Sequence, residues 1–231
     1  MSVLELKGVS VSRGGAPVIR DVDLIVSNGE VVTVVGPNGA GKTSLMEAIS
    51  GVTALSAGTI TIDGVSIVKS SRSARVRRGL AHVEQGRTVF PSLTVHENIR
   101  LSAASPAAAQ EALALFPELE KRISSPAGLL SGGEQQMVAL ARAFASRPRF
   151  LLIDEMSLGL APVVFTRLLP IVSSFAQAGV GVLLVEQFTN LALGVASRAL
   201  IVSGGAVTYS GDARILLDEP TVLHAAYLGG A

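Results

Sequence analysis

Residues 36–43 read Gly36-Pro37-Asn38-Gly39-Ala40-Gly41-Lys42-Thr43. This spacing matches G-x-x-x-x-G-K-[ST], in which the glycines let the backbone curl until its N–H groups converge on phosphate oxygens. The lysine neutralises the outer phosphates, the hydroxyl binds Mg²⁺, and the helix that follows directs its positive end at the same anions. A plain glycine turn is the alternative, but a chain with four lysines would produce roughly 0.01 such matches by chance. We therefore expect Lys42 to bind nucleotide phosphates and Thr43 to bind the metal.

The segments on either side of this loop predict an α/β core. An uninterrupted apolar run, 31–35, precedes the loop and is typical of a strand buried on both faces, and a helix is expected at 41–50. Alternating patterns at 3–11 and 18–26 indicate antiparallel strands at the N-terminal edge. Further strands are expected at 59–63, 80–84, 150–154, 180–185 and 200–203. Because helical stretches separate several of these strands, we expect parallel pairing in the core sheet.

Residues 93–142 interrupt this alternation. Apolar positions such as Val95, Ile99 and Phe116 recur there in helical patterns, with no strand-like run between them. We expect one domain, 1–231, in which a helical subdomain, 93–142, is inserted into a core formed by 1–92 and 143–231.

An arginine cluster precedes the strand expected at 80–84. Its members are Arg72, Arg75, Arg77 and Arg78. They could form a phosphate or lipid patch, but a run of like charges is more often a solvated helix face, which is what we expect here.

The composition excludes several classes of protein and site. The 231 residues include no cysteine, which rules out a disulfide framework, a thiolate zinc site and a cysteine nucleophile. The 19 basic and 18 acidic residues nearly cancel, so we expect no nucleic-acid partner. Residues 1–10 hold Glu5 and Lys7 and no apolar stretch, which predicts no secretory signal. The uncharged run 168–185 contains Pro170 and two glycines, and it indicates a helix followed by a buried strand, not a membrane span.

A second apolar run ends in two carboxylates, Asp154 and Glu155. Taken alone, such a pair is most often a solvated strand end. Behind a phosphate-binding loop the interpretation changes, because the carboxyl ends of parallel strands gather beside that loop. We expect Asp154 to hold Mg²⁺ through its water shell and Glu155 to act as general base toward the attacking water.

Residues 130–136 read Leu130-Ser131-Gly132-Gly133-Glu134-Gln135-Gln136. Ser131 followed three residues later by Glu134 is a capping box, which predicts a helix starting here and running to about residue 146. Two successive glycines in a helix cost about 1 kcal/mol each, and close approach to a phosphate would explain them. One phosphate-binding loop needs only one nucleotide. This second anion site therefore points to a nucleotide held by another subunit.

These motifs occur in the order found in the ATP-binding cassette (ABC) subunits of ABC transporters, which the chain resembles over essentially its whole length. The order is the phosphate-binding loop, Gln85 at a strand end, residues 130–136, the Asp154-Glu155 pair, and a strand that ends before Glu186-Gln187. Importers of branched-chain amino acids have an ATPase subunit with similar local stretches, which here are Gly86-Arg87 with Val89-Phe90, Met156-Ser157-Leu158-Gly159-Leu160-Ala161-Pro162, Leu184-Val185-Glu186-Gln187 and Ala226-Tyr227-Leu228-Gly229-Gly230. Importers of urea and short amides share this pattern.

The resemblance implies a P-loop NTPase cassette with a parallel core sheet, an N-terminal antiparallel β subdomain and an inserted helical subdomain. Two cassettes, identical or different, would close head to tail over ATP and Mg²⁺, and residues 158–162 would form the D-loop. The implied nucleotide-binding residues are Arg13, Gly36, Pro37, Asn38, Gly39, Ala40, Gly41, Lys42, Thr43, Ser44, Ser131, Gly132, Gly133 and Glu134. The implied metal ligands are Thr43, Gln85 and Asp154, and the implied catalytic residues are Glu155, Gln85 and Gln187.

Several positions depart from the usual cassette pattern. Arg13 stands where most cassettes place an aromatic ring under adenine, and its guanidinium could stack there or be solvated. Gln187 stands at the switch histidine, where an amide can hydrogen-bond a phosphate but carries no charge and shuttles no proton. Met156 replaces a proline, and Ala161 replaces the aspartate of many D-loops. Because the loop lysine and both carboxylates are retained, we still expect hydrolysis.

The resemblance therefore implies an ATP-hydrolysing subunit, peripheral on the cytoplasmic face of the cell membrane, that energises an importer of branched-chain amino acids. The implied partners are a second cassette, two transmembrane permease subunits and, indirectly, an extracytoplasmic solute-binding protein. The alternatives are an importer of urea, short amides or another small polar solute, and a degenerate regulatory cassette. Soluble ABC proteins of translation or DNA repair carry a second cassette or long coiled coils, which 231 residues do not fit.

Overall fold

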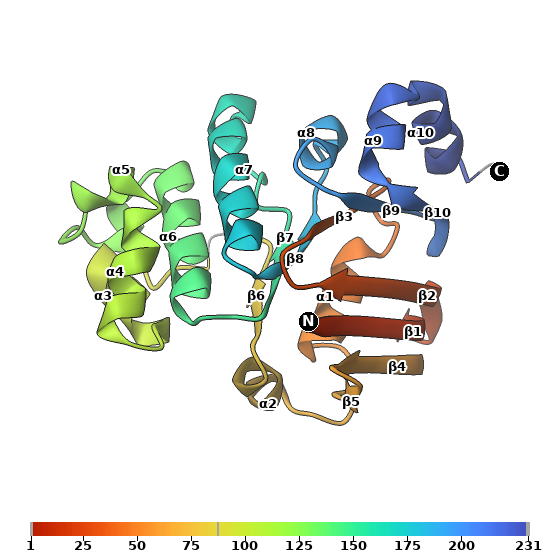
Figure 1. Ribbon diagram of the computed structural model, residues 1–231, viewed down its shortest axis with the longest axis horizontal. Helices are drawn as coiled ribbons and strands as arrows, with labels where there is room; N and C mark the ends of the chain where they lie inside the picture. Colours follow the sequence, from red (N-terminus) through yellow and green to blue (C-terminus); the bar gives the residue numbers. More distant parts are fainter. Residues whose placement is uncertain (1, 87, 230–231) are drawn as a thin grey trace.

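The computed structural model describes residues 2–86 and 88–229 (Figure 1). Arg87 and Gly230, which belong to the sequence motifs above, lie outside the described residues, as do Met1 and Ala231. The described residues form two β-sheets. A six-stranded sheet has the order β10-β9-β3-β8-β7-β6, in which β10 is antiparallel to β9 and the other pairs are parallel. A four-stranded antiparallel sheet has the order β2-β1-β4-β5.

The strand positions confirm the expected parallel core and antiparallel edge. The larger sheet contains β3 (Val31–Val35), β6 (Leu80–Val83), β7 (Phe150–Asp154), β8 (Gly181–Val185), β9 (Arg198–Ser203) and β10 (Ala206–Asp212). The smaller sheet contains β1 (Val3–Arg13), β2 (Ala16–Ser27), β4 (Ala57–Ile62) and β5 (Val65–Ser66).

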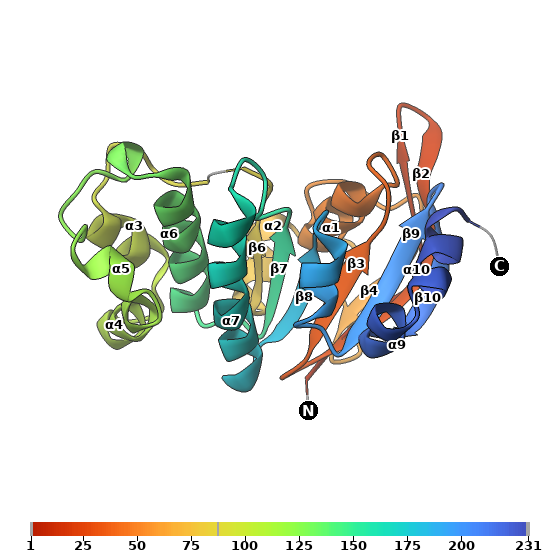
Figure 2. The same ribbon diagram turned by 90° about the horizontal axis from the view of Figure 1, so that it is seen from above.

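Helices and the smaller sheet cover both faces of the larger sheet, which is why its central strands are continuously apolar (Figure 2). In β3, Val32 and Val34 pack with α1 (Lys42–Ser50) and the smaller sheet. Val31 and Val35 point to the other face and pack with α7 (Pro162–Gln177). Three C-terminal helices cover that same face. They are α8 (Thr189–Leu193), α9 (Ala213–Asp218) and α10 (Pro220–Tyr227).

Between β6 and β7 the described residues form helices joined by turns and irregular loops, with one isolated bridge and no strand. The helices are α3 (Val95–Ser102), α4 (Pro106–Ala114), α5 (Pro117–Glu120), a 3₁₀ turn (Ala127–Leu129) and α6 (Gly132–Ala145). They gather at one end of the molecule (Figure 1). The expected end of the helical subdomain, residue 142, falls inside α6. The division into 1–92, 93–142 and 143–231 stays a proposal.

The arginine cluster is not a solvated helix face throughout, and this part of the prediction is wrong. Arg75, on α2 (Arg72–Arg77), is 4% exposed, and its Nη1 donates to the carbonyl oxygens of Ala48 and Ile49 at 2.7 Å each. These carbonyls lie in the last turn of α1, where a cation is favoured by the helix dipole and fills acceptors that the helix leaves open. Arg72 and Arg77 are exposed as expected.

The uncharged run 168–185 divides as predicted into the end of α7 and strand β8. Within the described ranges, none of the helices combines the length and apolar character needed to cross a bilayer.

Candidate active site

The loop between β3 and α1 requires glycine at two positions. Gly36 has φ 150° and Gly41 has φ 99°, both in the region that disfavours side chains. A Cβ on Gly36 would collide with the carbonyl of Val202, and one on Gly41 with the carbonyl of Val18. The loop is therefore enclosed by β9 and β2, and it ends where α1 begins at Lys42.

Lys42 lies inside the curl of this loop. It is 4% exposed, and its Nζ donates to the carbonyl oxygens of Gly36 at 2.8 Å and Pro37 at 2.9 Å. Burial lowers the pKa of Lys42, and the nearby carboxylates of Glu155 and Asp154 oppose that shift. An ammonium group at this position can meet the outer phosphates of a nucleotide, as the sequence predicted for Lys42.

Asp154 and Thr43 form the part of the site suited to a metal ion. Thr43 Oγ1 lies 3.4 Å from Asp154 Oδ1. Burial, aided by the charge of Glu155, raises the pKa of Asp154 to about 6, although its bond to Thr43 opposes the shift. A divalent cation beside this buried carboxyl would favour its charged form. A hydroxyl and a carboxylate are hard oxygen ligands of the kind Mg²⁺ takes, with phosphates and water completing its shell.

Glu155 is held by two amides from neighbouring strand ends. Gln85 follows β6 and Gln187 follows β8, and both donate from Nε2 to Oε2 of Glu155 at 2.8 Å. Strands β6, β7 and β8 are adjacent and parallel, so their carboxyl ends bring these three side chains together. Glu155 is 6% exposed. This arrangement can orient a carboxylate toward a water molecule without neutralising its charge.

A cavity of about 400 Å³ joins the loop to these residues. It is lined by Val18, Asn38, Gly39, Gly41, Lys42, Thr43, Ser44, Gln85, Glu155 and Gln187. Val18 was missed by sequence reasoning because nothing in an alternating strand pattern distinguishes it. The close approach of the Val18 carbonyl to Gly41 is a tertiary feature of β2, visible only once the fold is known.

Arg13 does not line this cavity but lies next to it, against α1. Its Nε donates to Ser44 Oγ at 3.0 Å, and its guanidinium forms an ion pair with Glu47. The side chain is 48% exposed, so the pair contributes little to stability. Adenine stacking by Arg13 remains a proposal, to which the structure adds this ion pair as a further role.

Ser131 and Glu134 form the predicted capping box at the start of α6. Ser131 N donates to Glu134 Oε2 at 2.8 Å, and Glu134 N donates to Ser131 Oγ at 3.3 Å. A Cβ on Gly133 would lie 2.7 Å from Val164 Cγ1, so close packing of α6 against α7 is a second reason for glycine there. Within the described part of the chain, residues 131–134 do not line the cavity around Lys42.

Comparison with known proteins assigns the family. The sequence model described as ABC transporter matches residues 19–157. The chain is 38% identical over 234 residues to the high-affinity branched-chain amino acid transport ATP-binding protein BraG of Pseudomonas aeruginosa, covering 99% of this chain and 100% of BraG. The chain belongs to the ABC transporter ATP-binding family. As an ABC ATPase it binds ATP, and the hydrolysis of ATP is coupled to transport.

Other relatives of this ABC ATPase belong to transport systems of a different kind. It is 34% identical to the lipopolysaccharide export system ATP-binding protein LptB of Escherichia coli K12, covering 99% of this chain and 98% of LptB. It is 26% identical, with a TM-score of 0.79, to an ATP-binding cassette solved as a dimer in a post-hydrolysis state with ADP and Pi, covering 91% of this chain and 99% of that one. The cassette fold expected from the sequence is thus confirmed.

Proposed function

We propose that this ABC ATPase energises the import of branched-chain amino acids, with hydrolysis at the cavity around Lys42. The observation that supports the chemistry is the convergence of Gln85, Glu155 and Gln187 beside the phosphate-binding loop. The observation that supports the solute is the full-length similarity to BraG. The similarity to LptB supports lipopolysaccharide export as the second candidate.

Each residue of the site has a distinct task in this proposal. Lys42 binds the outer phosphates, and Thr43 and Asp154 would hold Mg²⁺, which draws charge from those phosphates when bound. Glu155 accepts a proton from the attacking water, and Gln85 and Gln187 fix the direction of its carboxylate. A neutral amide at 187 can also donate to a phosphate oxygen, but it cannot return a proton.

Residues 131–134 would complete the site of a second cassette. Ser131 is exposed at the start of α6, away from the cavity of its own chain. In a head-to-tail pair, this helix start would face the phosphates bound by the partner cassette. The related cassette solved as a dimer with ADP and Pi supports such pairing.

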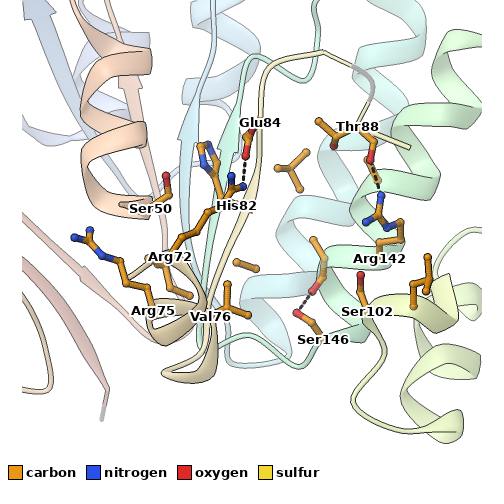
Figure 3. A pocket seen from close by; sticks show the side chains of 16 residues that line it. Ser50, Arg72, Arg75, Val76, His82, Glu84, Thr88, Ser102, Arg142 and Ser146 are labelled. Atoms are coloured by element: carbon orange, nitrogen blue, oxygen red, sulfur yellow. Dashed lines mark hydrogen bonds and ion pairs between the residues drawn. The ribbon is translucent and has the colours of Figure 1, made fainter. Parts of the chain in front are cut away.

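A second cavity, of about 520 Å³, suits contact with permease subunits. It lies between α2, β6 and α6, and Figure 3 shows Arg72, His82, Glu84 and Arg142 around it. Glu84 pairs with Arg72 and directly precedes Gln85. A permease segment docked in this cavity would therefore touch the chain segment that leads into Gln85, whose side chain hydrogen-bonds Glu155. Permease contact here would place the chain at the cytoplasmic face of the membrane.

The base role of Glu155 is tested with Glu155→Gln in the assembled transporter. The amide keeps the shape but accepts no proton from water, so turnover should be abolished while ATP binding is kept. Turnover at the wild-type rate would remove Glu155 from this role.

The solute is tested in source cells that lack this chain. Uptake of labelled leucine, isoleucine and valine should fall, and wild type should restore it where Glu155→Gln does not. Unchanged uptake of all three, with loss of lipopolysaccharide from the cell surface, would favour the second candidate.

A further inference from the structure

A fully buried carboxyl that takes no part in the proposed chemistry lies one residue before Gln187. Glu186 is 0% exposed. Its Oε2 accepts a hydrogen bond from Ser157 Oγ at 2.5 Å, and its Oε1 accepts one from Ser157 N at 3.2 Å. Burial raises the pKa of Glu186 to about 7, although hydrogen bonds from Ser157 and the Gln187 backbone oppose the shift. Burying a carboxyl is costly, whereas an apolar side chain would fill this place at no such cost.

Glu186 hydrogen-bonds Ser157, which lies just after a strained turn at the end of β7. Glu155 N donates to Val185 O at 2.9 Å and so extends the ladder between β7 and β8 by one residue. Glu155 then adopts φ 46°, in the left-handed region that is unfavourable for a residue with a side chain. Such a conformation persists only where its surroundings enforce it. Two residues further on, Ser157 makes its hydrogen bonds to Glu186.

Three successive residues at the end of β8, Val185, Glu186 and Gln187, thus each hydrogen-bond the turn that follows β7. The carbonyl of Val185 binds the backbone of Glu155, Glu186 binds Ser157, and the side chain of Gln187 binds Oε2 of Glu155 at 2.8 Å. The first two contacts set the course of the backbone that carries Glu155. The third contact acts directly on its carboxylate.

We propose that Glu186 is a positioning residue for ATP hydrolysis. Through its two hydrogen bonds to Ser157 it fixes the left-handed turn at Glu155, and this turn directs the Glu155 carboxylate into the cavity beside Lys42. The inference rests on the proposed function, in which Glu155 accepts the proton from water. It accounts for a buried carboxyl that neither lines the cavity nor contacts a phosphate-binding residue.

The test compares variants of both partners in the assembled transporter. Ser157→Ala removes the shortest contact, and Glu186→Ala removes both. In each variant kcat should fall at least tenfold while the KM for ATP stays within twofold, because the loop around Lys42 is unchanged. Glu186→Gln keeps an acceptor for Ser157 N and should retain more activity than Glu186→Ala. The double variant Ser157→Ala with Glu186→Ala should be no worse than Glu186→Ala alone, because Glu186→Ala already removes the contact that Ser157→Ala breaks.

Matched controls separate positioning from general destabilisation. Ser174→Ala removes another serine hydroxyl, which bonds Ile171 O at 2.7 Å within α7, and it should leave kcat unchanged. Ser157→Thr keeps a hydroxyl and should recover turnover relative to Ser157→Ala. If Glu186→Ala does not fold, Ser157→Ala decides the question.

A kcat within twofold of wild type in folded Ser157→Ala would overturn the inference, as would an equal fall in Ser174→Ala. Glu155→Gln is measured alongside. If Glu155→Gln abolishes turnover and Ser157→Ala does not reduce it, only the positioning role fails. If Glu155→Gln keeps wild-type turnover, the proposed function itself fails.

Discussion

Gln187 donates a hydrogen bond from Nε2 to Oε2 of Glu155 at 2.8 Å. The donor is a neutral amide that has one protonation state at all ordinary pH values. It can orient the carboxylate, but it contributes no positive charge to the site and takes no proton from it. The contact therefore separates orientation from proton transfer, two tasks that a histidine at the same position could combine.

Gln187→Ala should reduce turnover without abolishing it. The variant loses one hydrogen bond to Glu155, while the bond from Gln85 to the same oxygen remains. A single bond of this kind contributes about 0.5 to 1.5 kcal/mol, which corresponds to a fall in kcat of about tenfold or less. Steady-state ATPase assays on the assembled transporter measure this effect. A loss as complete as that expected for Glu155→Gln would show that Gln187 does more than orient the carboxylate.

Lys42→Ala should weaken ATP binding at least tenfold, which is about 1.4 kcal/mol. The reason is the loss of a buried ammonium group at the position where the outer phosphates would lie. Calorimetric titration of the purified chain with ATP measures the change. Lys69→Ala is the matched control, because Lys69 is exposed and does not line the cavity. Equal affinities in the two variants would contradict the assignment of residues 36–43.

Ser131→Arg should impair the site of the partner cassette and leave this chain's own ATP affinity intact. The new side chain places bulk and charge where the partner's nucleotide phosphates would lie, whereas Ser131 does not line the cavity around Lys42. Hydrolysis by the assembled transporter and ATP binding by the separate chain are measured together. A parallel loss of both would mean that residues 131–134 act within their own chain.

Arg75→Ala should lower the free energy of unfolding by about 3 kcal/mol or more, because it leaves buried carbonyl groups of α1 without donors. Chemical denaturation measured by circular dichroism tests the effect. Arg77→Ala, an exposed neighbour on the same helix, should change the stability by less than about 0.5 kcal/mol. Similar losses in both variants would contradict a special role for Arg75.

His82 should make the protein less stable as the pH falls from about 6.5 to 4. Burial lowers the pKa of His82 from 6.5 to about 4. In this pH range the unfolded chain therefore binds a proton at His82 and the folded chain does not, so stability is lost on acidification. The raised pKa values of Asp154 and Glu186 act in the opposite direction. The difference between wild type and His82→Gln isolates the effect of His82, and parallel pH profiles of unfolding would contradict it.

Sequence reasoning succeeded where the chemistry is local and failed where tertiary contacts decide. The places of the loop at 36–43, between β3 and α1, and of the pair Asp154-Glu155, at the end of β7, were predictable from residue types and spacing. The tasks assigned to these residues stay proposals. The meeting of Gln85 and Gln187 at Glu155 follows from the parallel order of β6, β7 and β8. The identity of the atoms that meet was not predictable.

The burial of Arg75 and the packing of Gly133 could not be read from the chain. A charged run has the same pattern whether its members face water or the end of another helix, and only the position of α1 decides between them. Likewise, the glycine pair at 132–133 matched a phosphate site, but the contact of Gly133 with Val164 depends on how closely α7 approaches α6.

Helix α1 is held at both ends, at its start by the loop that contains Lys42 and at its last turn by the contacts of Arg75. Its first residue, Lys42, lies in the loop expected to bind phosphates, and its last turn is bound by an arginine that also lines the cavity proposed for the permease. Helix α1 is nine residues long, about 14 Å at 1.5 Å per residue. A shift of α2 relative to α1 would have to break the guanidinium contacts, so a permease that displaces α2 is expected to displace the C-terminal end of α1 with it.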